Sequence, residues 1–166
     1  MAVTFNQIGS ESEPQNAKRY VNAYLRLFNE PENLKYLSFT GIPFARETVE
    51  AWLRDADASG VEYQTAVGED GEICAIMVTV NNPIEGYEIF SLVVDAGCRR
   101  LGVGSQLIDM AIRKAQEKGF HSVSIAVFAD NKRMLSLAIK KDFRPCQIGY
   151  RKRWDGEDIV YLKKYL

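Results

Sequence analysis

The hydrophobic and polar positions along the 166-residue chain predict strands and helices in a mixed order. Short runs rich in β-branched and aromatic residues predict strands at 3–8, 61–67, 73–80, 87–94, 122–128, 144–153 and 159–166. Apolar residues at helical spacing predict helices over 17–28, 46–59, 103–118 and 132–141. The segment 31–44 has no clear period, and we expect a loop or a short irregular helix there.

Residues with cap and turn preferences separate these elements. The stretch 12–15 has the spacing of a capping box, with Ser12 as the cap and Pro14 in the first turn of the helix. Asp130 is expected to cap the helix at 132–141. The turn at 68–71 predicts one hairpin, and residues around 154–157 join the last two strands in another.

The strand at 87–94 is apolar without a period of two, which is typical of a strand covered on both faces. A crossover helix leads from it to 122–128, so these two strands are expected to be parallel neighbours. The strands before it are expected to form an antiparallel meander. These features predict one α/β (α+β) domain over residues 1–166, with a mixed sheet of about six to seven strands flanked by about four helices.

A turn with two arginines and two glycines follows this central strand. Gly102 and Gly104 lack a Cβ, so backbone amides can approach a ligand there, and the next helix adds the positive end of its dipole. Arg99 and Arg100 add charged donors that suit a pyrophosphate. The turn is therefore a candidate site for a phosphorylated cofactor. The alternative is that the same residues form only a tight connection between strand and helix, with the two arginines in solvent. A Rossmann loop is not supported, because Leu107 stands in place of its third glycine.

The six residues from Arg99 to Gly104, RRLGVG, resemble the acetyl-CoA loop of the GNAT N-acetyltransferases, [Q/R]-x-x-G-x-[G/A]. Asn131 is similar to an asparagine that binds the cofactor arm in that family, and the resemblance covers roughly 61–166. It implies a GNAT fold whose parallel strands splay apart at their C-terminal ends to admit the pantetheine arm. The cofactor contacts that it implies fall on Leu92, Val93, Val94, Arg99, Arg100, Leu101, Gly102, Val103, Gly104, Ser105 and Asn131.

Glu88 is the candidate general base, because its place before the loop is similar to that of the glutamate in the family's histone-acetylating branch. A carboxylate can relay the proton that an alkylammonium loses before attack. A carboxylate at the sheet edge in solvent is the alternative, and Tyr87 or Glu85 could replace Glu88. In the family, the N-terminal helices line the side of the site that binds the acceptor. Acidic residues in the second predicted helix and just after its apolar stripe could therefore attract a cationic amine, or they could simply be the solvated face of that helix. These residues are Glu47, Glu50, Asp55 and Asp57.

The general acid of the family is missing from this sequence. Ala138 stands where a tyrosine usually protonates the departing thiolate, and Asp142 replaces a glycine of the same pattern. The identity of the acid is therefore in doubt. Tyr150, which is expected on the strand after this helix, is the candidate in its place.

Composition limits the function further. A net charge of −1 argues against a nucleic-acid binder with a broad basic face, and no apolar run reaches the ~20 residues of a membrane helix. The start of the chain lacks a signal peptide pattern, so a cytoplasmic location is expected. Cys74, Cys98 and Cys146 are odd in number and far apart, which predicts neither disulfides nor a metal site. His121 is expected to be structural.

Three functions follow from these observations. The first is an N-acetyltransferase that uses acetyl-CoA as co-substrate, without a metal, to acetylate a primary amine of a small molecule or a peptide. The second is a non-catalytic acyl-CoA-binding module, and the third is a nucleotide-binding α/β domain. The sequence does not identify the acceptor amine, and it leaves open whether the chain forms a homodimer.

Overall fold

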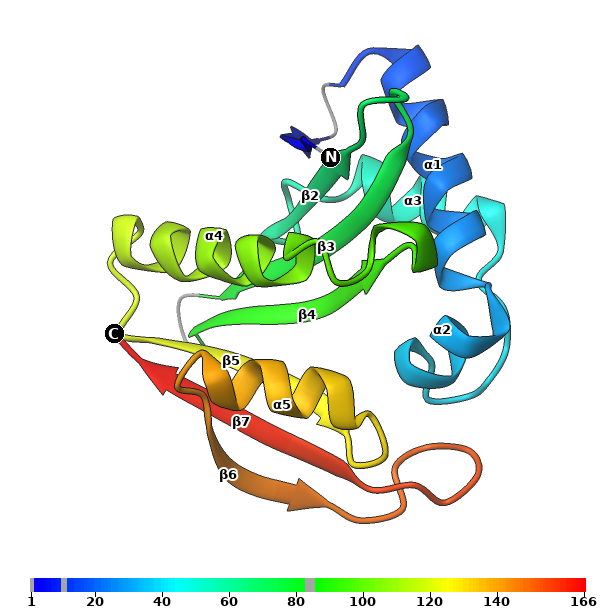
Figure 1. Ribbon diagram of the computed structural model, residues 1–166. Helices are drawn as coiled ribbons and strands as arrows, with labels where there is room; N and C mark the ends of the chain where they lie inside the picture. Colours follow the sequence, from blue (N-terminus) through cyan, green and yellow to red (C-terminus); the bar gives the residue numbers. More distant parts are fainter. Residues whose placement is uncertain (1, 10–11, 83–85) are drawn as a thin grey trace.

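The computed structural model describes residues 2–9, 12–82 and 86–166. Within these residues, seven strands form one sheet in the order β1-β2-β3-β4-β5-β7-β6 (Figure 1). The strands are β1 (Thr4–Ile8), β2 (Val61–Val67), β3 (Ile73–Asn82), β4 (Gly86–Val94), β5 (Ser122–Phe128), β6 (Arg144–Gly149) and β7 (Ile159–Tyr165). The helices are α1 (Pro14–Phe28), α2 (Pro31–Leu37), α3 (Arg46–Arg54), α4 (Val103–Glu117), α5 (Lys132–Lys140) and a 3₁₀ turn, η1 (Ala96–Cys98). The predicted mixed α/β fold is confirmed.

The strands β4 and β5 form the parallel pair of the sheet, and they are paired over a short length. The paired residues are Tyr87 with Val123, Glu88 with Ser124, and Ile89 with Ile125. Beyond these pairs β4 and β5 diverge toward α2 and the start of α5 (Figure 1). The predicted splay of the parallel strands is therefore confirmed, and one edge of β4 lacks a strand partner along this described stretch.

A β-bulge lies where the two strands separate. Thr79 of β3 pairs with Ile89, whereas Val78 pairs with Ser91, so Phe90 is an extra residue in β4. A bulge bends a strand and shifts the alternation of its side chains. Glu88 therefore comes before the shift in this strand, and Leu92 to Val94 come after it.

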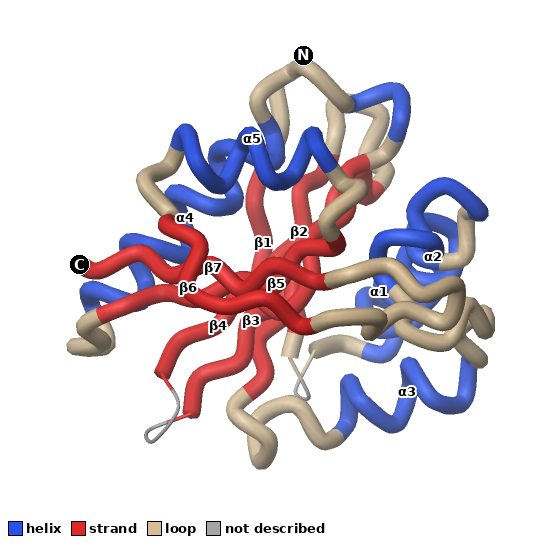
Figure 2. Tube along the Cα trace, turned by 90° about the horizontal axis from the view of Figure 1, so that it is seen from below, coloured by secondary structure: helices blue, strands red, loops and turns tan. Residues whose placement is uncertain are grey.

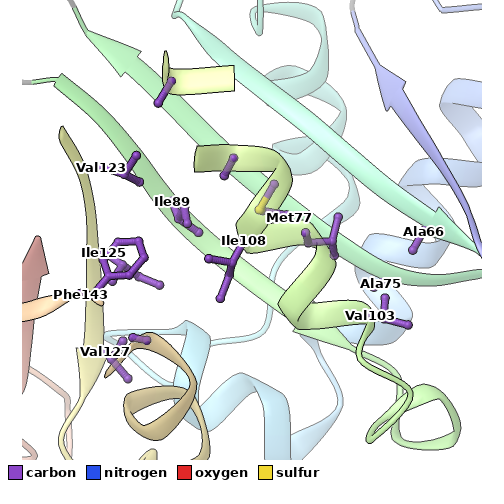
Figure 3. Close-up of a cluster of buried hydrophobic side chains, with 14 of the residues drawn as sticks. Ala66, Ala75, Met77, Ile89, Val103, Ile108, Val123, Ile125, Val127 and Phe143 are labelled. Atoms are coloured by element: carbon purple, nitrogen blue, oxygen red, sulfur yellow. The ribbon is translucent and has the colours of Figure 1, made fainter. Parts of the chain in front are cut away.

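Two hydrophobic clusters cover the two faces of the sheet. Helices α4 and α5 cover one face over side chains that include Met77, Ile89, Ile108, Val123 and Phe143 (Figure 3). Helices α1 and α3 cover the other, over side chains that include Tyr20, Leu27, Leu53, Ile76 and Val93. Figure 2 shows α4 and α5 on one side of the strands and α1 and α3 on the other. The splayed strands thus lie between two helical layers.

Several predicted details are wrong. The hydroxyl of Ser12 accepts a hydrogen bond from the Gly9 N–H and does not cap α1, whose N-cap is Glu13 without a side-chain bond. Asn131, not Asp130, caps α5. Helix α3 ends at Arg54, five residues before the predicted 59, and β6 ends at Gly149 instead of 153. By contrast, the segment 31–44, where a loop or a short irregular helix was expected, contains the short helix α2 followed by a loop.

Candidate active site

A cavity of about 620 Å³ lies between the C-terminal half of β4, the turn after it and the starts of α4 and α5. We call it the β4–α4 cavity. Its walls are formed by Glu32, Asn33, Tyr36, Leu37, Leu92, Val93, Val94, Cys98, Arg99, Arg100, Gly102, Val103, Gly104, Ser105, Asp130, Asn131, Lys132, Arg133, Met134 and Leu137. Every residue for which the sequence implied a cofactor contact lines this cavity, except Leu101, which is 45% exposed.

The backbone of the turn suits an anion. Arg100 and Gly102 have positive φ angles of 68° and 77°, and Gly102 begins α4 without a side-chain cap. The first N–H groups of a helix have no partner within it, so those of α4 are available to a ligand in the cavity. A Cβ at Gly104 would lie 3.6 Å from Val94 Cγ2, which is ordinary van der Waals contact, so this position is closely surrounded but not overcrowded.

Arg99 fixes one wall of the cavity in place. Its Nε donates to the carbonyl of Val94 at 3.2 Å, its Nη1 to Glu32 Oε2 at 3.1 Å, and its Nη2 to Asn33 Oδ1 at 2.8 Å. Arg99 therefore ties α2 to the end of β4, and three of its nitrogens already have partners. Arg100 is exposed at the same cavity and is the more available of the two arginines.

The start of α5 forms the facing wall. Asn131 accepts a hydrogen bond from the Met134 N–H on Oδ1 at 3.2 Å, so this side chain caps the helix at the cavity. The amide nitrogen of the same side chain retains donors for a ligand. Asp130 beside it accepts from the buried Arg153 and pairs with Lys35 of α2 at 2.8 Å. Hydrogen bonds from Arg153 lower the pKa of Asp130 to about 2.

A second cavity, of about 700 Å³, lies beyond the splay, and we call it the aromatic cavity. Its aromatic lining residues are Tyr24, Phe28, Tyr36, Phe39, Phe44, Trp52, Tyr63, Phe90, Phe128 and Tyr161. The other lining residues are Leu37, Ser38, Thr40, Asp55, Ser59, Val61, Val78, Val80, Glu88, Ile89, Ser91, Leu92, Ile125, Ala126, Val127, Met134 and Ile159. Glu88 and Asp55 are the carboxylates among the described residues of this wall.

The two cavities share one wall. Tyr36, Leu37, Leu92 and Met134 line both of them. These side chains come from α2, from β4 beyond the bulge, and from the first turn of α5. A ligand that extends along the open edge of β4 from one cavity therefore reaches the other at this wall.

Glu88 lies in the aromatic cavity and is half-buried. It also lines a smaller hollow of about 530 Å³ toward β6 and β7. Its neighbour Tyr87 is buried on the other face, donates to Thr79 Oγ1 at 3.2 Å, and has its pKa raised to about 12 by burial. Tyr87 thus lies outside the lining of both cavities, and Glu85 lies outside the described residues.

The candidate acid Tyr150 lies away from both cavities. It comes directly after β6, is 71% exposed, and lines neither of them. Ala138, in the position of the family's tyrosine, is fully buried in the hydrophobic cluster beneath α5. The structure instead places Tyr36 on the wall that the two cavities share. The aperiodic segment 31–44 gave no signal for this residue.

The three cysteines are free, and Cys98 lines the β4–α4 cavity. Cys74 and Cys98 are buried free thiols and Cys146 is an exposed one. Burial raises the pKa of Cys74 to about 12, so this thiol stays protonated at neutral pH.

Leu107 is fully buried and packs in the core under α4. A dinucleotide loop with a third glycine is therefore absent from this described turn.

The sequence model of the acetyltransferase (GNAT) family matches residues 23–143, which is well over half of the chain. The chain belongs to the acetyltransferase (GNAT) family. This membership supports acyl transfer as the class of reaction and removes the nucleotide-binding domain from consideration. No curated protein matches the chain. In the part of this GNAT protein that the structure describes, no helix is long and apolar enough to cross a bilayer.

Solved structures of acetyltransferases share the fold. An N-acetyltransferase from Staphylococcus aureus Mu50 superposes with a TM-score of 0.83 at 18% identity, and 99% of each chain is covered. A phosphinothricin acetyltransferase from Sinorhizobium meliloti in complex with AcCoA gives 0.83 at 13% identity, over 100% of this chain and 89% of that one. A ribosomal-protein-alanine N-acetyltransferase from Brucella melitensis gives 0.76 at 19%, over all of both chains. At these identities the likeness extends to the fold alone.

Proposed function

We propose that this protein transfers the acetyl group of acetyl-CoA to a primary amine. One observation carries the proposal: an anion-binding turn and an aromatic cavity with a carboxylate meet at the splay of β4 and β5. The likeness in fold to an acetyltransferase in complex with AcCoA supports the same cofactor here.

The β4–α4 cavity suits the cofactor. The amides of Gly102, Val103, Gly104 and Ser105 would bind the pyrophosphate, helped by the charge of Arg100. The pantetheine arm would lie along the open edge of β4 at Leu92 to Val94, where backbone groups can pair with its amides as a strand would. A backbone N–H near Val93 would then polarise the thioester carbonyl, and preorganised donors of this kind are often a large part of catalysis. Asn131 Nδ2 would bind the arm from the other wall.

The acceptor amine would enter through the aromatic cavity. Glu88 would accept its proton, the nitrogen would attack the thioester carbon, and the C–S bond would break as the amide forms. A strand rises about 3.3 Å per residue, so Glu88 lies roughly 10 to 13 Å from Leu92 along the bulged strand and would relay the proton through water. The leaving thiol has a pKa near 8.5, so the thiolate can depart without full protonation, aided by the dipole of α5.

A non-catalytic acyl-CoA-binding module is the second candidate, because Ala138 removes the usual acid. The experiment incubates the protein with acetyl-CoA and a panel of amines, measures thiol release, and identifies the acetylated product by mass spectrometry. Turnover with at least one amine is expected. Calorimetric binding of acetyl-CoA without turnover of any amine would favour the binding module, and a failure to bind acetyl-CoA would exclude both candidates.

A further inference from the structure

The aromatic side chains of the acceptor side support one another in a fixed arrangement. Tyr24 stacks on Phe28 with ring centroids 3.8 Å apart, and Phe44 meets these two rings edge-on at 5.6 and 5.8 Å. Trp52 extends the group, with its ring 5.9 Å from that of Phe44. Such edge and stacked contacts orient rings in specific geometries, so this wall is formed before a ligand arrives.

Large apolar side chains are exposed at this cavity. Phe39, Trp52 and Phe90 are 50%, 42% and 64% exposed, and all three line it. Phe39 is fixed by an edge contact with Phe128 at 5.3 Å, and Phe90 is the bulge residue of β4. An exposed apolar surface that is concave and rigid is typical of a binding site for an apolar group.

The charge of the cavity has one sign. Glu88 and Asp55 are its carboxylates, and none of its described lining residues is a lysine, arginine or histidine. A cationic group in the cavity can therefore pair with a carboxylate. An anionic group finds no counter-charge among these described lining residues, and burying an unpaired charge is costly.

We infer that the acceptor is a monoamine with an aromatic body and no carboxylate beside the amine. This inference rests on the proposed acetyl transfer. The aromatic body packs against Phe44 and Trp52, and the amine points toward Glu88 and the shared wall at Leu92. A volume of about 700 Å³ lies within the usual range for a site that holds a small ligand. An amino acid, phosphinothricin included, brings an anionic group that this wall leaves unpaired, and a polyamine places further cations among aromatic and aliphatic side chains.

The test measures binding to the CoA-saturated protein by calorimetry, so that turnover is not needed. The ligands are 2-phenylethylamine, n-butylamine, phenylalanine and spermidine. We expect 2-phenylethylamine to bind at least about tenfold more tightly than each of the others. Equal or tighter binding of phenylalanine or spermidine would overturn the inference. So would tighter binding of a peptide amide with an N-terminal phenylalanine, which would assign the site to peptides.

Two variants locate the aromatic body. Trp52→Ala should weaken the binding of 2-phenylethylamine at least about fivefold, while the affinities for n-butylamine and CoA stay unchanged. Ile42→Ala, at a side chain 69% exposed and outside the cavity, is the matched control and should change none of these affinities. An unchanged affinity in Trp52→Ala would place the ligand elsewhere and contradict the inference.

The outcomes separate this inference from the proposed function. If another amine is acetylated while 2-phenylethylamine does not bind, the acceptor class is wrong and the acetyltransferase stands. If 2-phenylethylamine binds with the expected preference but no amine is acetylated, the acceptor site stands as a binding site and the acetyltransferase is wrong.

Discussion

Arg153 and Asp130 form a two-pronged ion pair, with Nη1 to Oδ1 at 2.9 Å and Nη2 to Oδ2 at 2.8 Å. The Arg153 side chain is 1% exposed, and its Nε donates to Asp155 at 2.8 Å. Its Nη1 also donates to the carbonyl of Lys35 in α2 at 3.3 Å. One buried guanidinium thus joins the β6–β7 loop to the start of α5 and to helix α2, and residues of α2 and of the start of α5 line both cavities.

Replacing Arg153 should destabilise the protein. Arg153→Met leaves two carboxylates and a carbonyl without their donor, and breaking a buried pair costs about 3 kcal/mol. The free energy of unfolding should therefore fall by about that amount in urea titrations. Lys164→Met is the control, because its partner Asp142 is 84% exposed, and it should cost less than about 1 kcal/mol. A similar small loss in both variants would contradict the structural role of Arg153.

The same pair predicts a dependence of stability on pH. The pKa of Asp130 is about 2 in the folded protein, below its ordinary value, so the unfolded chain binds this proton more readily. The contribution to stability is then complete above about pH 5 and is lost as the pH falls toward 2.

We expect Asp130→Asn to lower the free energy of unfolding by about 2 kcal/mol at about pH 5 and by much less near about pH 2. Urea titrations at both pH values measure this difference. Asp142→Asn controls for the loss of one exposed negative charge. A deficit in Asp130→Asn that is the same at both pH values would mean that the carboxylate charge contributes nothing.

Gly104 offers a test of the cofactor site. A Cβ at this position would lie 3.6 to 3.9 Å from Val94, Leu137 and Leu92, which is ordinary contact, so Gly104→Ala should fold and bind nearly as the wild type does. The branched side chain of Gly104→Val would extend into the β4–α4 cavity. It should lower the affinity for CoA at least about tenfold, as measured by calorimetric titration. Its melting temperature should stay close to that of the alanine variant. Unchanged CoA affinity in a folded Gly104→Val protein would remove the cofactor from this turn.

The residues that the sequence implied for the cofactor line one cavity in large part because they are local in the chain. A buried strand, a glycine turn and a helix follow one another from Gly86 to Glu117, and half of the residues that surround the β4–α4 cavity come from this stretch. The parallel pairing of β4 with β5 also follows from the order of elements, since a crossover helix joins the two strands, whereas their splay was implied only by the resemblance to the GNAT family. The bulge at Phe90 was not predictable, because β-branched and aromatic residues continue through it without a change of pattern.

The acceptor side could not be predicted from local patterns. Its wall combines Tyr24 of α1, Trp52 of α3, Phe128 of β5 and Tyr161 of β7, which only tertiary packing brings together. Arg153 gave no signal either, since a cation in a turn beside Trp154 and Asp155 usually lies in solvent. The cap of α5 was misplaced by one residue, because Asp130 pairs with Arg153 and leaves that role to Asn131.

Glu88→Gln tests the general base. The amide cannot accept the proton of the acceptor amine, so turnover should fall by about 10² to 10⁴ while the affinity for acetyl-CoA stays unchanged. The rate should recover in part as the pH rises and the free amine becomes more abundant. Glu72→Gln, at an exposed position in the β2–β3 turn, should have the rate of the wild type. If Glu88→Gln retains full turnover at neutral pH, the proton leaves by another route.

The last prediction concerns the proton that the departing thiolate takes up. Tyr36 lies on the wall shared by the two cavities, whereas Tyr150 is 71% exposed and lines neither. If Tyr36 supplies this proton, Tyr36→Phe should lower kcat by about tenfold. This effect is smaller than the effect of removing a general acid in a reaction with a poorer leaving group, because a thiolate leaves readily. Tyr150→Phe should leave kcat unchanged. Both changes remove one hydroxyl and keep the ring, so packing is preserved and each variant controls for the other. Single-turnover rates at saturating acetyl-CoA and acceptor separate this step from product release, and a loss confined to Tyr150→Phe would return the role of the acid to that exposed tyrosine.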